Sequence, residues 1–305
     1  MGMFVHILSS SVIELEEKII PATNDIIFKA MFVQNQELLK AFLSAALGIS
    51  ISEIGTLTIK NPEIPPVYID SKLARLDILA EINGIIVNIE MQVAKKEDYK
   101  ERSLLYWSRM YSEEMKKGKP YNSISRCICI NVLNFGMFDC PEFHSSFSVR
   151  EDNRNELLTD KMHLHFFELT KVKAVSKRNR PDEQDALRLW LQLFKADSEE
   201  ELDMLKNTSV TAIQGGVDAI YSLSRDEKIR EYARQRELAE IDYNLDVANA
   251  EARGRAKGKA EGKAEGMEMG MLNTLIELVK DGILTLADGA KRANMSIEDF
   301  KKKLD

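Results

Sequence analysis

Residues 75–92 read RLDILAEINGIIVNIEMQ and place Asn83-Gly84 between two runs of β-prone residues. Asn-Gly in this setting is typical of a β-hairpin that turns through two residues in a type I′ turn. Pairing then runs outward from the turn one residue at a time, and it sets Asp77 directly opposite Glu90. The sequence therefore predicts a hairpin whose open end carries two facing carboxylates.

Alternation along the two strands separates an apolar face from a face with polar groups, because successive side chains point to opposite sides. The apolar face, which we expect to lie on the core, consists of Leu76, Ile78, Ala80, Ile82, Ile85, Val87, Ile89, Met91 and Val93. The other face gathers its polar groups toward the open end, where Gln92 points the same way as Asp77 and Glu90.

Two carboxylates directly opposed across a strand pair cost stability, by roughly several tenths of a kcal/mol. A cation between them removes that cost. Mg²⁺ suits the place because it binds one or two carboxylates and keeps waters that leave room for a phosphate. Gln92 could orient such a water. The pattern alone leaves an alternative open, in which the polar face is solvated and Arg75 neutralises the pair.

The segments around the hairpin predict one mixed α/β domain. Apolar periodicity from Phe28 to Leu43 indicates helical structure. Thr23 or Asn24 is the expected N-cap of this structure, and Gly48 is its expected end. We expect one strand before the hairpin, then a helix and two strands after it, over residues 53–60, 99–117, 124–133 and 161–169. The resulting order is αα-βββ-α-β-β, and it ends near residue 175.

The rest of the chain is helical by composition and rich in charge, with glycine at every fourth position from 254 to 270. Small residues at that spacing suit either close helix–helix contact, as in a dimer, or a flexible linker. We expect a homodimer through the helical C-terminal half. The predicted divisions are a leader (1–20), the α/β domain (21–175), a helical region (176–250), the glycine tract as helix or linker (251–270) and a small helical hairpin (271–305).

The composition is that of a globular protein, since the 305 residues are 44% hydrophobic and 30% charged. Apolar runs stay far below the ~18 residues of a transmembrane helix, and the N-terminus lacks the basic region and cleavage site of a signal peptide. We therefore expect no membrane partner. Three cysteines are too few for a disulfide framework, so we expect a cytoplasmic protein. Because the net charge is −7, any DNA contact would come from local basic patches or metal ions.

The hairpin resembles the D…(E/D)-x-K signature of PD-(D/E)XK nucleases, with Asp77 followed by Glu90-Met91-Gln92 in an E-x-Q form. The chain resembles more closely the recombination-promoting nuclease (Rpn) family of transposase-like proteins. This second resemblance covers residues 20–175 well and the tail loosely. It rests on Asn24-Asp25-x-x-Phe28-Lys29, residues 75–92, Arg102-x-x-x-Tyr106 with Tyr111 and Gly118-x-x-Tyr121, HLHFFEL at 163–169, and the glycine repeat.

The resemblance implies a restriction-endonuclease-like mixed sheet flanked by helices, followed by an α-helical C-terminal region. It also implies a Mg²⁺-dependent DNA endonuclease that hydrolyses phosphodiester bonds with metal-activated water, in recombination or mobile-DNA processing. Asp77 and Glu90 would ligate one or two Mg²⁺ ions, with the carbonyl of Met91 as a further ligand. Asp25 matches the helix acid that completes such a site, although the helix dipole also favours an acid in a first turn.

Gln92 departs from the family pattern, because a lysine usually stands there. An amide can neither supply positive charge nor act as a general base, so Gln92 can only position the water or the phosphate. Lys29, one turn after Asp25, could meet a phosphate. Arg102 and Tyr106 share one stripe of their helix and could hold a phosphate or a carboxylate. For Lys29, Arg102 and Tyr106, a place on a solvated helix face is the alternative.

Two rival functions fit the same sequence. The first is a catalytically inactive descendant that binds DNA or protein, and the neutral Gln92 makes it conceivable. The second is an interaction protein whose glycine-rich helix drives assembly and whose polar hairpin face is merely solvated. Divalent-metal binding that depends on Asp77 would distinguish the nuclease from this second rival.

Overall fold

The computed structural model describes residues 18–61, 77–95, 98–115, 118 and 120–304. The chain divides into two compact units, which are Met1–Glu237 (unit 1) and Leu238–Asp305 (unit 2). Most of the predicted leader lies outside the described residues, and so do Arg75 and Leu76 of the predicted hairpin.

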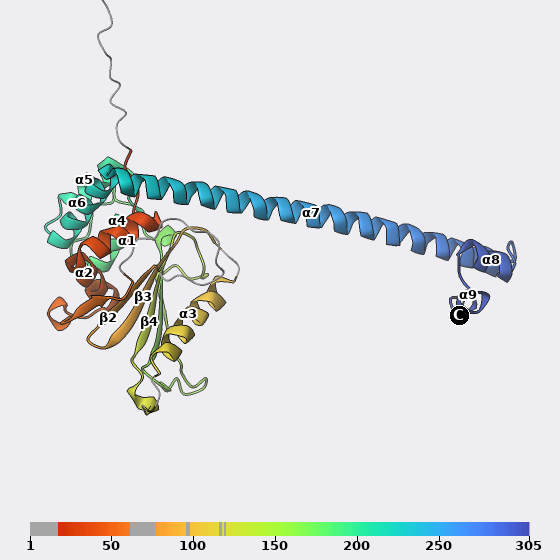
Figure 1. The fold of residues 1–305 in the computed structure, drawn as a ribbon, viewed down its shortest axis with the longest axis horizontal. Coiled ribbons are helices and arrows are strands. Elements are labelled where there is room, and N and C mark those ends of the chain that lie inside the picture. The colour runs from red at the N-terminus through yellow and green to blue at the C-terminus, as the bar shows by residue number, and fades with distance from the viewer. Residues whose placement is uncertain (1–17, 62–76, 96–97, 116–117, 119, 305) are drawn as a thin grey trace, which may run out of the picture. The chain divides into compact units, whose positions relative to one another are not determined.

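Unit 1 is built on a six-stranded mixed sheet with the strand order β1-β2-β3-β4-β6-β5 (Figure 1). β3, β4 and β6 run parallel to one another, whereas the other neighbours are antiparallel. The strands are β1 (Leu57–Ile59), β2 (Ile78–Ile82), β3 (Ile85–Gln92), β4 (Cys127–Leu133), β5 (His144–Phe147) and β6 (Met162–Glu168). This sheet, flanked by helices, is the restriction-endonuclease-like fold that the sequence predicts.

The strand at the centre of the parallel group is β4, whose sequence CICINVL is buried at every position. A near-continuous apolar run is typical of a parallel strand that is covered on both faces. The edge strand β5 was not predicted. Its sequence HSSF has four residues and two serines, so it carries little β-strand signal, and antiparallel pairing with β6 defines it instead.

The predicted hairpin forms with the predicted turn and register. Asn83 and Gly84 have φ angles of 51° and 77°, and a type I′ turn needs this left-handed backbone at both of its central residues. The ladder then pairs β2 with β3 from the turn outward to Ile78 opposite Ile89. The Asn83 side chain also donates to the Glu53 carbonyl oxygen at 2.6 Å, which ties the turn to the segment before β1.

One face of the sheet, which includes the predicted apolar residues from Ile78 to Met91, shares a hydrophobic core with five helices that lie wholly within unit 1. These are α1 (Asp25–Gln34), α2 (Gln36–Leu47), α4 (Ala186–Lys195), α5 (Glu199–Lys206) and α6 (Thr211–Arg225). Val93, predicted on the apolar face of the hairpin, is 44% exposed. Within this core, the rings of neighbouring aromatic residues lie 5.1–6.1 Å apart, in a cluster of Phe28, Phe32, Phe42, Trp190 and Phe194. Asn24 caps α1 as predicted, and Asn35 separates α1 from α2 because its side chain caps the second helix.

The opposite face of the sheet is covered by α3 (Tyr99–Glu113). Figure 1 shows this helix on the side of the sheet away from α1 and α2. Met110 of this helix belongs to the same hydrophobic cluster as Cys127 and Cys129 of β4, and the Trp107 indole donates to the Cys127 carbonyl oxygen at 2.9 Å. The polar face of the hairpin therefore lies on the side of the sheet that α3 covers.

The helix α7 (Glu227–Lys280) begins in unit 1 and continues into unit 2. It includes the glycine tract, and a Cβ added at any of these five glycines would meet no atom within 4 Å. In unit 2, α8 (Leu286–Arg292) and α9 (Ile297–Lys301) pack with the end of α7 around Leu275, Ala290 and Phe300. None of the described helices is long and apolar enough to cross a membrane.

Candidate active site

Asp77 and Glu90 meet at the open end of the hairpin, where β2 begins and β3 approaches its end. The Asp77 backbone N–H donates to Glu90 Oε1 at 3.3 Å, and the Met91 backbone N–H donates to Asp77 Oδ2 at 2.8 Å. Glu90 is only 2% exposed. Asp77 is half-buried as a residue, but its carboxylate points inward to these contacts. The burial of Glu90 rules out the alternative in which this face is merely solvated.

Burial makes the two carboxylates costly to ionise together. Burial and then the charge of Asp25 raise the pKa of Asp77 to about 7. Burial and then the charge of Asp77 hold the pKa of Glu90 well above its usual range. Perturbed carboxylates of this kind concentrate at functional sites, because a bound substrate or ion supplies the missing compensation.

The oxygen atoms of this pair fit a hard divalent cation. Among the described residues, no group of three His, Cys, Asp or Glu side chains is arranged to hold a metal ion. A metal here would therefore take two carboxylates and complete its shell with main-chain carbonyls, water or substrate oxygens. Mg²⁺ binds in this way, since it usually keeps several waters and uses one or two carboxylates.

Two buried asparagines lie next to Glu90 in the sheet, and one of them hydrogen-bonds its carboxylate. Asn88 is fully buried, and its Nδ2 donates to Glu90 Oε1 at 2.9 Å. Asn131 pairs with Glu90 in the β3–β4 ladder, and its Oδ1 accepts from the Tyr99 hydroxyl at 3.0 Å and from Ser103 Oγ at 3.3 Å. We did not single out Asn131 from the sequence, although a polar residue inside an otherwise apolar strand is a usable signal.

The α3 stripe predicted from Arg102 and Tyr106 faces the carboxylates. Arg102 Nε donates to the Tyr106 hydroxyl at 2.5 Å, and Tyr106 is 5% exposed. The positive charge of Arg102 lowers the pKa of Glu90, against the larger effect of burial. Further along the same stripe, Arg109 and Glu113 form an exposed pair. The alternative of a solvated helix face therefore holds for Arg109 and Glu113, but it is wrong for Tyr106.

The first turns of α1 bring two further predicted residues to the site. The charge of Asp25 raises the pKa of Asp77, whereas the charge of Lys29 lowers it, so both side chains act on that carboxylate. Lys29 is 8% exposed, which excludes the solvated alternative for this lysine. The site thus gathers predicted residues from α1, the β2–β3 hairpin and α3.

Two predicted roles have weaker geometric support. The Gln92 side-chain amide donates to the Ala94 carbonyl oxygen at 3.4 Å, so its hydrogen bond is local. Met91 contacts the pair through its backbone N–H, and its side chain is buried in the apolar core.

Arg236 is a residue that our sequence reasoning missed. It lies in the part of α7 that belongs to unit 1, and its Nε is 2.7 Å from Asp25 Oδ2. The charge of Arg236 also lowers the pKa of Asp77. Several arginines and glutamates occur in this part of α7, so the sequence offers no signal that selects Arg236 from its neighbours.

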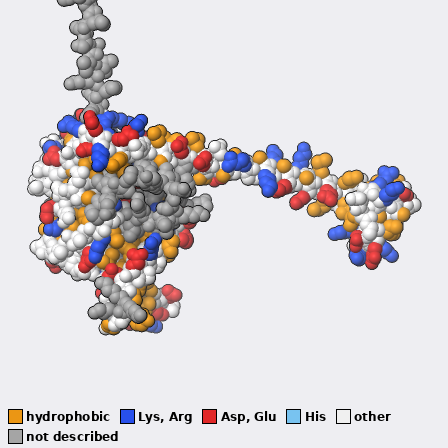
Figure 2. Space-filling view, viewed as in Figure 1, with side chains coloured by type: hydrophobic (Ala, Val, Ile, Leu, Met, Phe, Trp, Pro, Cys, Tyr) orange, Lys and Arg blue, Asp and Glu red, His pale blue; other side chains and the backbone are white. Residues whose placement is uncertain are grey.

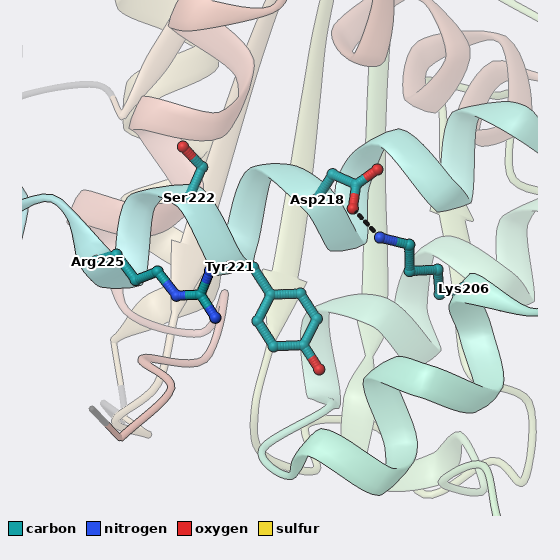
Figure 3. Close-up of a pocket in the computed structure, with 5 residues that line it drawn as sticks. All are labelled: Lys206, Asp218, Tyr221, Ser222 and Arg225. Carbon is teal, nitrogen blue, oxygen red and sulfur yellow. Dashed lines mark hydrogen bonds and ion pairs between the residues drawn. The ribbon is translucent and has the colours of Figure 1, made fainter. Parts of the chain in front are cut away.

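A hollow in unit 1 shares no residue with this site. It has a volume of about 480 Å³ and lies along α5 and α6 (Figure 3). Figure 3 shows Lys206 of α5 paired with Asp218 of α6, beside Tyr221 and Arg225. Lys206 and Asp218 compensate each other, and the Arg225 guanidinium lies over the Tyr221 ring at 6.0 Å, so we assign this hollow no chemistry.

The sequence model of PD-(D/E)XK nuclease family transposases matches residues 22–250. The chain belongs to this family. The matched range contains Asp25, Asp77, Glu90 and Arg236, so the whole carboxylate site falls within the family region. Membership confirms the superfamily and the transposase-like character predicted from the sequence, and it indicates nuclease activity. No curated protein and no solved structure matches the chain.

The site of this nuclease-family protein predicts an increase in stability when one of its charges is removed. Without metal at pH 8, Glu90→Gln removes the repulsion with Asp77 and keeps an oxygen for the Asn88 hydrogen bond. The free energy of unfolding should rise by about 1–3 kcal/mol, since a tenfold displacement of an ionisation equilibrium is worth about 1.4 kcal/mol. Urea unfolding in EDTA measures this change. The exposed Glu113→Gln is the control, and a stability loss in Glu90→Gln would contradict the prediction.

Proposed function

We propose that this protein is a Mg²⁺-dependent DNA endonuclease of the Rpn type, which hydrolyses phosphodiester bonds during recombination or mobile-DNA processing. The observation that carries the proposal is the buried pair Asp77–Glu90, which lies inside a PD-(D/E)XK nuclease family region. A buried like-charge pair costs stability, and binding of a divalent cation is the simplest compensation that its oxygen atoms offer.

We assign two roles to the residues of the site, which are binding of the ion and binding of the substrate. Asp77 and Glu90 would hold one or two Mg²⁺ ions, together with the Met91 carbonyl. When bound, Mg²⁺ promotes ionisation of water and offsets the charge on the reacting phosphate. Asn88 and the Asp77 backbone N–H orient the Glu90 carboxylate before the ion arrives.

The substrate phosphate would meet cationic groups on two helices. Lys29 of α1 acts electrostatically on Asp77, and Arg102 of α3 acts on Glu90. Arg102 is aligned by the Tyr106 hydroxyl, which restricts its guanidinium to one side of α3. Asp25 completes the acidic edge of the site, and Gln92 would position a water or a phosphate oxygen by hydrogen bonding.

A second candidate function is a catalytically inactive DNA- or protein-binding module on the same fold. The observation in its favour is Gln92, a neutral residue at the motif position that usually holds lysine, whose amide donates to Ala94. Both carboxylates are nevertheless retained and buried together. We therefore favour the active nuclease.

We further propose a cytoplasmic homodimer that assembles through the helical C-terminal half. Leu238, Ile241 and Leu245 on α7 have the spacing of one helix stripe and are each about half-exposed. On the face that Figure 2 shows, basic and acidic side chains are interspersed along unit 2, so this face presents no continuous basic stripe for DNA. The three cysteines are free thiols, as is usual in a reducing compartment.

The dimer proposal predicts a dependence on these apolar residues. Leu245→Glu should convert a dimer of the full chain into a monomer, because a charge would interrupt the apolar stripe. Sedimentation equilibrium measures the change, with Ile283→Glu as the control, because Ile283 is exposed and lies beyond the end of α7. A wild-type chain that is monomeric at all concentrations would contradict the proposal.

The nuclease proposal predicts nicking of supercoiled plasmid in Mg²⁺ and no nicking in EDTA. Asp77→Ala and Glu90→Ala should each lower the rate at least about 100-fold, as expected for loss of a group that stabilises charge in the reaction. Glu113→Ala, an exposed acid on α3, should nick like the wild type. Absence of nicking with metal binding retained would favour the inactive module, and equal nicking by the Asp77→Ala variant would overturn the site.

A further inference from the structure

Packing at the start of α7 directs Arg236 toward the carboxylate site. Ile229 and Ala233 are 5% and 3% exposed and belong to the main core of unit 1. Arg236 follows them at the spacing i, i+4, i+7, so these three residues lie on one side of the helix. The arginine therefore extends the buried stripe of α7 to the point where the helix passes the first turn of α1.

At that point Arg236 makes a defined contact and keeps further donors available. Its Nε lies 2.7 Å from Asp25 Oδ2, and its side chain is 46% exposed. A guanidinium carries five N–H groups in one plane, of which the Nε contact uses one. The planar arrangement of the remaining groups matches phosphate oxygens better than an ammonium does.

The charge balance of the site favours such a cation. Asp77 interacts electrostatically with Asp25 on one side and with Glu90 on the other, and a DNA phosphate adds a further negative group. The motif position that would supply a lysine holds Gln92, which is neutral and donates to Ala94. A cation from another element that reaches the site can therefore do what this lysine would do when DNA enters.

We propose that Arg236, held beside the carboxylates by Asp25, binds a DNA backbone phosphate at the site and supplies the positive charge that position 92 lacks. This inference rests on the proposed nuclease function and deepens it by naming a substrate-binding residue on α7. Lys29 and Arg102 flank the carboxylates from α1 and α3, and Arg236 adds a third, partly exposed cation from a third helix.

The test measures binding of the full chain to a short fluorescent DNA duplex in Mg²⁺ by anisotropy, at several KCl concentrations. The Glu90→Gln background prevents cleavage during the measurement. Loss of one phosphate contact should lower the slope of log affinity against log salt by about 0.9. We expect this loss in Arg236→Gln, with roughly 5- to 20-fold weaker binding near physiological salt, and rescue of the slope in Arg236→Lys.

Arg234→Gln is the matched control. Arg234 lies two residues earlier on α7, is 67% exposed and pairs with Glu231 at 3.0 Å. Its substitution should leave the slope unchanged. Asp25→Asn distinguishes anchoring of α7 from phosphate binding, because it removes the ion pair with Arg236 but keeps the arginine itself. If Arg236 only anchors α7, Asp25→Asn and Arg236→Gln will weaken binding equally, and the inference is wrong.

The remaining outcomes distinguish this inference from the nuclease proposal itself. Plasmid nicking by the chain with Glu90 intact, together with an unchanged slope in Arg236→Gln, overturns the role of Arg236 alone. A slope that falls equally in Arg234→Gln also overturns it, because a nonspecific loss of charge would then explain the effect. A chain that neither nicks plasmid nor binds the duplex overturns both proposals.

Discussion

The placement of two carboxylates against each other at the end of a buried hairpin is the constraint on which the rest of this site depends. A type I′ turn at Asn83 and Gly84 fixes the register, and the register brings Asp77 to Glu90. A one-residue slip would send one of them to the other face of the sheet. Because α3 covers this face, Glu90 stays buried and its hydrogen bond from Asn88 is protected from competition with water.

The surrounding elements reduce the cost of this arrangement without removing it. Backbone N–H groups of the hairpin contact both carboxylates, and Arg102 lowers the pKa of Glu90. Burial nevertheless has the larger effect, so the pKa values of both acids remain raised. Natural proteins keep such destabilising groups where function needs them. The family match and the carboxylate oxygens of the site indicate that this function is nuclease chemistry.

The features predicted from the sequence are those that local chemistry determines. The Asn-Gly turn, the alternation of β2 and β3, the Asn24 cap and the glycine that ends α2 each act over a few residues, and each is confirmed. Contacts between distant segments were harder to foresee. The cover that α3 provides, the partners of Asn131 and the approach of Arg236 to Asp25 all depend on tertiary packing. The edge strand β5 depends on its neighbour β6 in the same way.

The central claim is that the buried pair Asp77–Glu90 is a metal site, and isothermal titration calorimetry of the full chain with Mg²⁺ and Mn²⁺ tests it most directly. The measurement needs neither DNA nor turnover, so it is independent of substrate preference. The account predicts saturable binding of one or two ions by the wild type and loss of that binding in Asp77→Asn, while Glu113→Gln binds normally. Absence of binding in the wild type, or equal binding in Asp77→Asn, would contradict it.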